Sequence, residues 1–364
     1  MGLADQWLAT RNRLLASPRF QQFALDYWPF NVIARRRSRQ LFDLLAGFAY
    51  SQVLFATVKL GLIEMLQEGP LATADIARRT GWDAGRLERL LKAAAALNIL
   101  EPTHAGYALG SHGAALAGNP WIAKFILHHH LLYEDLADPL ALLSGKTGGG
   151  KLRQYWGYPG SGEVNAPTAE TYSALMAASQ QAVTAEILSA YDFGVHQHLI
   201  DVGGGNGTFL AAAAGKHRGL KVTLFDLPAV AELARPKLAH LGGRAAVVGG
   251  SFLSDPLPAG PDVATLVRIA HDHDDGAVLA ILGNIRRMLP ANGQLILAEP
   301  LSGIPSIAPV ADAYFGLYFA AMGQGRARSA DEIGRLAREA GFTKLQVVNT
   351  RNPLVCSLLR LSMV

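Results

Sequence analysis

The 364-residue sequence has a single cysteine, Cys356, so no disulfide bond can form within the chain. Its first residues lack the basic stretch followed by an apolar run that marks a secretory signal peptide. Long apolar runs are also missing near the N-terminus, where the longest uncharged stretch, residues 44–58, has 15 residues against the roughly 20 that a spanning helix needs. We therefore expect a protein of the reducing cytoplasm without a transmembrane helix.

Charged residues are scarce too. They make up 17% of the chain, and 33 basic against 29 acidic side chains leave a net charge of +4. With 50% hydrophobic residues, the chain is too apolar for intrinsic disorder. Its length exceeds the roughly 250–300 residues at which a single core stops growing. We expect four segments, covering residues 1–45, 46–120, 121–190 and 191–364.

The first segment, residues 1–45, is predicted to be a helical arm that mixes aromatic and basic side chains. This mixture suits an anionic membrane surface or a partner subunit, and it also suits an ordinary solvated basic face. The side chains concerned are Trp7, Phe20, Phe23, Tyr27, Trp28 and Phe30, together with Arg11, Arg13, Arg19, Arg35, Arg36, Arg37 and Arg39.

The second segment has the order helix, turn, helix and hairpin, which predicts a winged helix. A helix begins near Thr73, another runs from Arg86 to Leu97, and Gly106 turns the following hairpin. Winged helices often bind DNA, through cations such as those of Arg86, Arg89 and Lys92. The segment carries little basic charge for that role, so we expect no nucleic-acid partner and keep a DNA-binding regulator only as an alternative.

Residues 121–190 are predicted to be mostly helical. They include the run His128, His129 and His130. Neighbours on a helix point about 100° apart, and no HExxH spacing is present, so we expect no metal site here. These histidines are expected on a pocket wall or at the surface.

The last segment alternates strands, loops and helices, which predicts a doubly wound α/β domain with a mainly parallel, Rossmann-like sheet. Ligands of such sheets bind beyond the carboxyl ends of the strands. The expected strands are His198–Val202, Lys221–Phe225, Ala245–Val248, Asp262–Val267 and Gln294–Ala298.

Polar residues and glycines follow these strand ends. After the first strand comes Asp201-Val-Gly-Gly-Gly-Asn-Gly, and Asp226, 25 positions beyond Asp201, is spaced for a carboxylate that binds ribose hydroxyls. The glycine pattern is D-x-G-x-G-x-G, whereas dinucleotide sites have G-x-G-x-x-G and phosphate loops end in G-K-[ST]. The first strands therefore favour a nucleoside ligand without a pyrophosphate.

At this point the sequence resembles the S-adenosylmethionine-dependent O-methyltransferases of the plant caffeate and bacterial small-molecule type. The matching segments are Leu199-Ile-Asp-Val-Gly-Gly-Gly-Asn-Gly, Phe225-Asp-Leu-Pro-Ala-Val, Pro256-Leu-Pro-Ala-Gly-Pro-Asp and Ala270-His-Asp-His-Asp-Asp. The resemblance extends over nearly the whole chain, because that family also has an N-terminal winged-helix dimerisation domain. The resemblance implies a homodimer that uses S-adenosyl-L-methionine, releases S-adenosyl-L-homocysteine and needs no metal.

A closer resemblance is to the carotenoid hydroxyl O-methyltransferases of purple phototrophic bacteria. The segments that carry it are Leu15-Ala-Ser-Pro-Arg-Phe, Ile33-Ala-Arg-Arg-Arg-Ser-Arg-Gln-Leu-Phe-Asp-Leu, Phe48-Ala-Tyr-Ser-Gln, His271-Asp-His-Asp-Asp and Asp312-Ala-Tyr-Phe-Gly-Leu-Tyr-Phe-Ala-Ala-Met-Gly. This likeness implies methylation of the tertiary hydroxyl of an acyclic carotenoid, as in spheroidene- and spirilloxanthin-type biosynthesis. A bacteriochlorophyll-type tetrapyrrole or a phenolic metabolite stays open as the acceptor.

The family's cofactor motifs imply a set of binding residues. Gly203 and Gly205 would line the cofactor, Asp226 would hold the ribose, and Ser251 and Phe252 would flank the adenine. Ser251 stands where the family usually has aspartate, which predicts altered recognition of the adenine amino group. The remaining members of the set are Asp201, Leu227 and Arg268, the last near the family's contact to the methionine carboxylate.

The family's catalytic motifs imply His271 as general base and Glu299 as the carboxylate that orients it. His273, which stands in place of the family's tryptophan, is an alternative base. The family's second orienting carboxylate is replaced by Ala327. The candidate walls of the substrate pocket are Tyr172, Met176, Tyr314, Phe315, Tyr318, Phe319 and Met322. Ordinary core packing explains each of these side chains as well as a role in the pocket does. A lipophilic acceptor also predicts peripheral contact with the inner or photosynthetic membrane.

Overall fold

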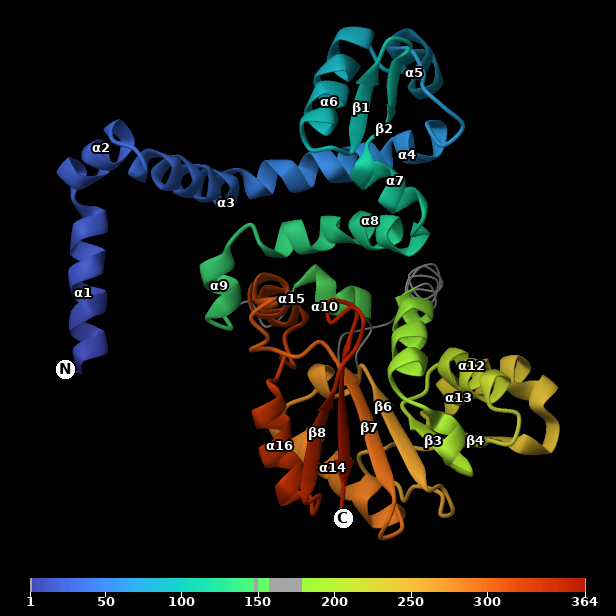
Figure 1. The fold of residues 1–364 in the computed structure, drawn as a ribbon. Helices are drawn as coiled ribbons and strands as arrows, with labels where there is room; N and C mark the ends of the chain where they lie inside the picture. The colour runs from blue at the N-terminus through green and yellow to red at the C-terminus, as the bar shows by residue number, and fades with distance from the viewer. Residues whose placement is uncertain (1, 147–149, 157–178, 364) are drawn as a thin grey trace. The chain divides into compact units, whose positions relative to one another are not determined.

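The computed structural model describes residues 2–146, 150–156 and 179–363, and the chain divides into two compact units, Met1–Leu127 and His128–Val364 (Figure 1). Each unit has its own hydrophobic core. The predicted pocket residues Tyr172 and Met176 lie outside the described residues.

The first unit begins with three consecutive helices, α1 (Leu3–Ala16), α2 (Pro18–Asp26) and α3 (Phe30–Lys59). Pro18 occupies the first turn of α2, where its missing N–H costs nothing. None of the residues of α1 is buried, and α2 buries only Ala24. The predicted surface helices of the arm are therefore present, with most of their apolar side chains exposed.

Helix α3 is longer than the uncharged run 44–58 suggested. It has 30 residues and contains an 18-residue window of mean hydropathy 1.5, of which 11% is buried. By length and composition alone it could cross a membrane, a criterion that the uncharged run did not meet. Thr57 and Val58, in its last turn, are buried, and Val58 belongs to the core of the first unit.

The predicted winged helix follows. Its elements are α4 (Leu62–Met65), α5 (Thr73–Thr80), α6 (Ala84–Ala96), β1 (Leu100–Thr103), β2 (Gly106–Leu109) and α7 (Ser111–Ala117). Leu87 and Leu91 of α6 pack with Leu62 and Ile99 in one core. Gly106 has a φ of +125°, and a Cβ there would lie 2.1 Å from the carbonyl oxygen of Leu71. Only glycine therefore fits this turn of the hairpin.

The second unit surrounds a seven-stranded sheet of order β5-β4-β3-β6-β7-β9-β8 (Figure 1). Strands β3 to β7 are parallel, and β9 runs antiparallel between β7 and β8. The bounds are β3 (His198–Val202), β4 (Lys221–Asp226), β5 (Ala245–Gly249), β6 (Val263–Val267), β7 (Gln294–Glu299), β8 (Lys344–Val348) and β9 (Ser357–Ser362). The five predicted strands are confirmed within one residue at each end, whereas β8 and β9 were not predicted.

Helices cover both faces of this sheet, as expected for a doubly wound domain. Helices α12 (Thr208–Lys216) and α13 (Pro228–Leu238) pack on one face, and α14 (Asp275–Met288) and α16 (Ala330–Glu339) pack on the other. The remaining helices are α8 (Pro120–Asp135), α9 (Pro139–Leu143), α10 (Lys151–Trp156), the π-helix Pro309–Tyr314 and α15 (Phe315–Met322), and residues 179–190 are also helical.

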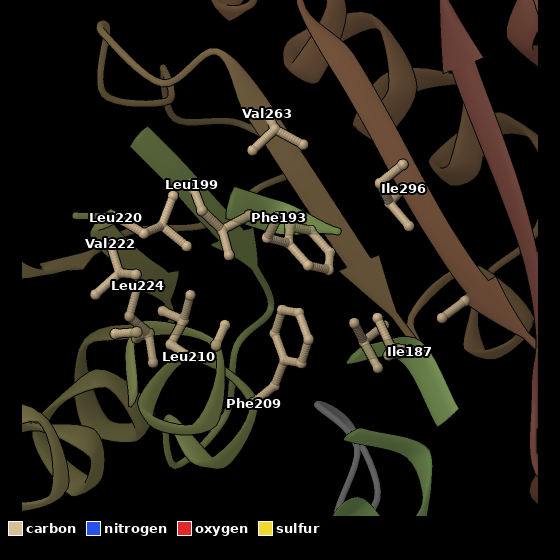
Figure 2. Packing of buried hydrophobic residues seen from close by; sticks show 14 of the residues in the cluster. Ile187, Phe193, Leu199, Phe209, Leu210, Leu220, Val222, Leu224, Val263 and Ile296 are labelled. Atoms are coloured by element: carbon tan, nitrogen blue, oxygen red, sulfur yellow. The ribbon is translucent and has the colours of Figure 1, made fainter. Parts of the chain in front are cut away.

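The strands alternate between two cores because their side chains point to opposite faces. Leu199 packs with Phe193 and Phe209 on the first face, while Ile200 belongs to the second core (Figure 2). The chain runs outward from β3 to β5 and then returns to β6, which pairs with β3 on its other side. In sheets of this kind, ligands bind beyond the carboxyl ends of the strands at such a reversal, which here lies between β3 and β6.

Candidate active site

The loop after β3 has the backbone shape that the glycine motif predicted. Gly203, Gly205 and Gly207 have φ values of +74°, +56° and +75°, in the region that favours glycine. The Gly203 N–H donates to the carbonyl oxygen of Phe225 over 2.8 Å, which ties the loop to β4. A Cβ at Gly205 would meet no atom within 4 Å, so the loop backbone borders open space at this point.

Asp226 ends β4 beside this loop and is largely buried. One carboxylate oxygen accepts the Gly205 N–H at 2.8 Å and the other accepts the Leu227 N–H at 2.7 Å. Burial raises the pKa of this carboxyl, and the two backbone hydrogen bonds oppose the shift. Each carboxylate oxygen has a second lone pair, so the group can still accept two hydroxyl protons.

Asp201, by contrast, faces the neighbouring strand. Its carboxylate accepts a hydrogen bond from the Thr265 hydroxyl over 2.7 Å, and it is fully enclosed. Burial, with the negative charge of Asp226 as a smaller cause, raises the pKa of Asp201 to about 7, against the lowering by Thr265. A Cβ at Gly204 would come within 3.0 Å of the same carboxylate, so Asp201 supports the loop from beneath.

Ser251 and Phe252 follow β5. The Ser251 N–H donates to Asp255 over 2.8 Å, and the Ser251 hydroxyl is near the Leu253 N–H at 3.3 Å. The Phe252 ring meets the His273 ring edge to face at 5.6 Å between centroids. The carboxylate of Asp255 thus lies beside the position where the family's aspartate is replaced by Ser251. Its position in the sequence, four residues later, gave no sign of this contact.

Arg268 follows β6 with a φ of +57°, an uncommon conformation for a residue other than glycine. Its N–H donates to the carbonyl oxygen of Ala298 at 2.8 Å, and its guanidinium donates to the Ser179 hydroxyl at 3.0 Å. Strained backbone of this kind costs about 1–3 kcal/mol and clusters at functional sites. The guanidinium is therefore held at the strand edge where an anionic ligand group was expected.

His271 and Glu299 are brought together as the strand-end pattern implied. His271 lies in the 3₁₀ turn Ala270–Asp272 after β6, and Glu299 is the last residue of β7. Glu299 Oε2 is hydrogen-bonded to His271 Nδ1, and Oε1 accepts the N–H groups of Ile269 at 2.9 Å and Ala270 at 2.7 Å. The carboxylate therefore fixes both the imidazole and the backbone that carries it.

A second carboxylate, which the sequence reasoning did not assign, faces the other ring nitrogen. Asp272 Oδ1 lies 3.1 Å from His271 Nε2. Burial lowers the pKa of His271, but the charges and hydrogen bonds of Asp272 and Glu299 outweigh it and raise the pKa to about 10. The imidazole is therefore protonated at neutral pH while both carboxylates contact it. A protonated imidazole carries a hydrogen on each nitrogen and has no lone pair for a further proton.

The alternative base, His273, has a different environment. Burial lowers the pKa of His273, with smaller effects from the charges around it. Its ring packs on Phe252, whereas Glu299 contacts His271. The geometry of the carboxylate thus favours His271 over His273.

An aromatic cluster lies next to His271. The His271 ring stacks on Phe319 at 5.0 Å, and Phe319 stacks on Phe315 at 5.6 Å. Two of the predicted wall residues bind the histidine run, since Tyr318 and His128 Nε2 are 3.0 Å apart and Tyr314 and His129 Nε2 are 2.8 Å apart.

These side chains are mostly enclosed. Tyr318, Phe319 and Met322 are buried, and burial raises the pKa of Tyr314. Burial also lowers the pKa of His128 to about 4, so this imidazole is neutral. Within the described ranges, no three His, Cys, Asp or Glu side chains are grouped so as to hold a metal ion.

Comparison with protein-family models identifies two matched regions. Residues 133–343 match an O-methyltransferase domain, and residues 42–118 match an O-methyltransferase dimerisation domain. The chain belongs to this O-methyltransferase family. It is therefore an S-adenosylmethionine-dependent O-methyltransferase that carries the family's dimerisation domain.

Three curated relatives match most of the chain. Demethylspheroidene O-methyltransferase of Cereibacter sphaeroides is 42% identical over 95% of this chain and 92% of its own length. The enzyme of the same name from Rhodobacter capsulatus is 38% identical over 90% of this chain and 83% of its own. Phenazine O-methyltransferase PhzM of Lysobacter antibioticus is 30% identical over 86% of this chain and 93% of its own.

Solved structures have the same fold. The S-adenosylmethionine-dependent methyltransferase SibL matches with a TM-score of 0.77 and 23% identity, covering 89% of this chain and 98% of SibL. LaPhzM matches with a TM-score of 0.72 and 27% identity, covering 90% of this chain and 99% of LaPhzM. The predicted fold class, a mostly helical N-terminal region before a mainly parallel sheet, is confirmed.

Proposed function

We propose that this O-methyltransferase transfers the methyl group of S-adenosylmethionine to the tertiary hydroxyl of a hydroxylated acyclic carotenoid. The observation that carries the proposal is the 42% identity to a demethylspheroidene O-methyltransferase over 95% of the chain. The second enzyme of that name supports it independently, while the phenazine enzyme is more distant at 30%.

The residues at the strand ends fit the methyl donor. Asp226 has lone pairs to accept the ribose hydroxyls, and Gly205 leaves room beside the loop for a nucleoside. Phe252 and Leu227 offer apolar surface, and the Arg268 guanidinium is available for the amino-acid carboxylate. When bound, S-adenosylmethionine supplies a reactive methyl group on a positively charged sulfur.

His271 acts as the general base in this proposal. When the acceptor hydroxyl replaces Asp272 at Nε2, the imidazole loses one carboxylate partner, its pKa falls toward its ordinary range, and its Nε2 proton is released to water. Glu299 keeps the proton of the neutral ring on Nδ1, so Nε2 presents its lone pair to the hydroxyl. The hydroxyl proton moves to Nε2 as the oxygen bonds to the methyl carbon.

Orientation of the hydroxyl contributes more than the base. Holding reactants in line supplies about 7–11 kcal/mol, whereas a general base typically adds about 10²–10⁴-fold, equivalent to about 2.7–5.4 kcal/mol. A tertiary alcohol is far less acidic than an imidazolium, so the proton leaves during the attack and not before it. The pocket must therefore position the acceptor tightly beside His271.

Labelled methyl transfer tests this function. Purified protein is incubated with S-adenosylmethionine labelled in its methyl group and with demethylspheroidene, a tetrapyrrole or a small phenol, and each product is analysed by mass spectrometry. We expect label only in a methyl ether of the carotenoid. Label in the tetrapyrrole or the phenol alone would reject the carotenoid assignment. His271→Ala should lower turnover at least about 100-fold with similar cofactor affinity, and parental turnover would remove its role.

We also propose that the protein is a homodimer in which residues 1–41, the part of the predicted arm before the dimerisation match, bind anionic lipid at the inner or photosynthetic membrane. This part of the arm carries seven arginines and two aspartates, a net charge of +5, while the whole chain carries only +4. Its side chains Leu3, Trp7 and Trp28 are 87%, 62% and 79% exposed. The dimerisation match begins at residue 42, so the arm lies outside it.

Exposed apolar side chains within that match have a different expected partner. Leu44, Leu45 and Phe48 of α3 are exposed in the single chain and fall inside residues 42–118, so we assign them to the contact with the second copy.

The lipid contact of the arm follows from its composition. Aromatic groups beside arginines suit the lipid headgroup region, and each cation near an anionic surface contributes about 1 kcal/mol.

Vesicle sedimentation separates the two roles. We expect the protein to bind vesicles containing phosphatidylglycerol, to bind phosphatidylcholine alone more weakly, and to be released by salt. Replacement of Arg35, Arg36, Arg37 and Arg39 by glutamine should weaken binding without changing the dimer measured by light scattering. Unchanged vesicle binding, or a monomeric variant, would overturn the lipid assignment.

A further inference from the structure

The segment Gly325–Arg328 covers the carbonyl side of the turn that carries His271. The Arg326 N–H donates to the carbonyl oxygen of His271 over 2.9 Å. Gly325 has a φ of +77°, and a Cβ there would lie 2.0 Å from that same oxygen. The segment can approach this closely only because position 325 is glycine. The approach places Arg328 next to the turn that carries His271.

Arg328 is one of the few enclosed charges of the second unit, with only 3% of its surface exposed. Its Nη1 donates to the carbonyl oxygen of Ala270 at 2.6 Å, and Nη2 donates to that of His273 at 2.7 Å. Its Nε donates to the carboxylate of Asp275 at 2.8 Å. The guanidinium thus spans the residues immediately before and after His271–Asp272.

We infer that Arg328 is a positioning residue for methyl transfer, because its guanidinium holds the backbone on both sides of His271 and so sets the direction of the imidazole. This inference rests on the proposed role of His271 as the base. The rigid fork of an arginine can bridge two carbonyl groups and a carboxylate at once, which the single ammonium group of a lysine cannot do in the same geometry.

Arg328 and Glu299 bind different backbone groups of the turn that carries His271. Glu299 accepts the N–H groups of Ile269 and Ala270, while Arg328 donates to the carbonyl groups of Ala270 and His273. Ala327 stands where the family has its second orienting carboxylate, so that side chain gives the imidazole no support from this segment. The support that this segment gives the turn comes from the Arg326 N–H, which donates to His271, and from the Arg328 guanidinium, which donates to the carbonyl groups on both sides.

Arg328→Lys tests the inference because it keeps the charge and removes the fork. Turnover with demethylspheroidene should fall about 10–100-fold with little change in KM for either substrate, as expected when a reacting group is displaced by about 1 Å. The acid limb of the kcat profile should also move to lower pH, because a displaced imidazole loses part of its contact with Glu299. A general loss of folded protein would reduce the rate without moving this limb.

Arg326→Gln is the matched control. It removes a guanidinium from the same segment that also contacts Asp275, yet it keeps the backbone N–H that reaches His271. We expect its pH profile to match that of the parent. If folded Arg328→Lys has both the turnover and the acid limb of the parent, the inference is wrong.

A second variant and a second measurement keep the outcome decisive. If Arg328→Lys does not fold, Asp275→Ala removes the carboxylate partner from a half-exposed position, and its acid limb should move in the same direction. An unmoved limb would overturn the inference. Titration of His271 by NMR needs no acceptor: a lower pKa in either variant supports positioning even if the carotenoid assignment fails, and an unchanged pKa refutes it.

Discussion

Replacement of Glu299 by glutamine tests how the base is oriented. Glutamine keeps a carbonyl oxygen for the N–H groups of Ile269 and Ala270, so the turn should retain its backbone hydrogen bonds. Its amide NH₂ then faces His271 Nδ1 in place of a carboxylate oxygen. The neutral imidazole is forced to accept at Nδ1 and to carry its proton on Nε2, the atom that takes the hydroxyl proton in the mechanism that we propose.

The magnitude follows from the loss of the base alone. General-base catalysis contributes about 10²–10⁴-fold, so Glu299→Gln should reduce kcat by this factor, or about 2.7–5.4 kcal/mol. Residual turnover should remain because the larger orientation contribution does not depend on this proton. Cofactor affinity should change little, since the hydrogen-bond partners of Glu299 in the described part of the chain, Ile269, Ala270 and His271, are not cofactor-binding candidates.

Single-turnover methyl transfer and calorimetric binding of S-adenosylhomocysteine measure these two quantities separately. The double variant His271→Ala/Glu299→Gln should be no slower than His271→Ala alone, because Glu299 acts through the ring. The reasoning fails if Glu299→Gln keeps more than about a tenth of the parental kcat while His271→Ala loses about 100-fold. An equal loss of cofactor affinity would place Glu299 at the cofactor instead.

Two further predictions concern Asp272 and the glycine loop. Asp272→Asn should lower the pKa of His271 from about 10, moving the acid limb of kcat/KM to lower pH. The pKa of His271 in the folded protein lies above the unfolded value of 6.5, so the stability that its protonation contributes is complete below pH 6.5 and is lost as the pH rises through about 10. The free energy of unfolding, measured by chemical denaturation, should therefore depend less on pH in the variant than in the parent over this range. Parallel pH dependences would disprove the prediction. Gly203→Ala combines a positive φ with a Cβ 2.6 Å from the Ile269 side chain and should destabilise the fold by more than the roughly 1–2 kcal/mol expected for Gly205→Ala, which meets no atom. Gly205→Ala should instead weaken S-adenosylhomocysteine binding more than it weakens the fold, and the reverse order in both assays would contradict this view of the loop.

The protonated state of His271 has a functional consequence. With Asp272 and Glu299 on its two nitrogens, the imidazole is held in a form that cannot take a proton. If His271 is the base that we propose, the acceptor hydroxyl must take the place of Asp272 at Nε2 before the ring can accept a proton, and proton acceptance is then coupled to acceptor binding.

The parallel strands were predictable because each buried strand is a short apolar run bounded by turn residues. Asp226, His271 and Glu299 could be assigned to one edge since parallel strands place their carboxyl ends together. Strand β8 was missed because it is largely exposed, and no periodic pattern separates such a run from a loop. Strand β9 is almost entirely buried, and its apolar residues were a signal for a strand that the sequence analysis did not use. The uncharged run 44–58 is shorter than α3 because Asp43 ends the run without ending the helix.

The sequence by itself determined the order of strands and helices, the glycine loop and the residue types at the strand ends, because these follow from local spacing and burial. Only the tertiary structure decided which groups meet. Asp272 at Nε2, Asp255 beside Ser251 and Arg328 behind the turn depend on loops whose course is set by contacts between residues up to 58 positions apart. Such contacts carry no periodic signal along the chain, since a loop closes wherever buried backbone groups find hydrogen-bond partners.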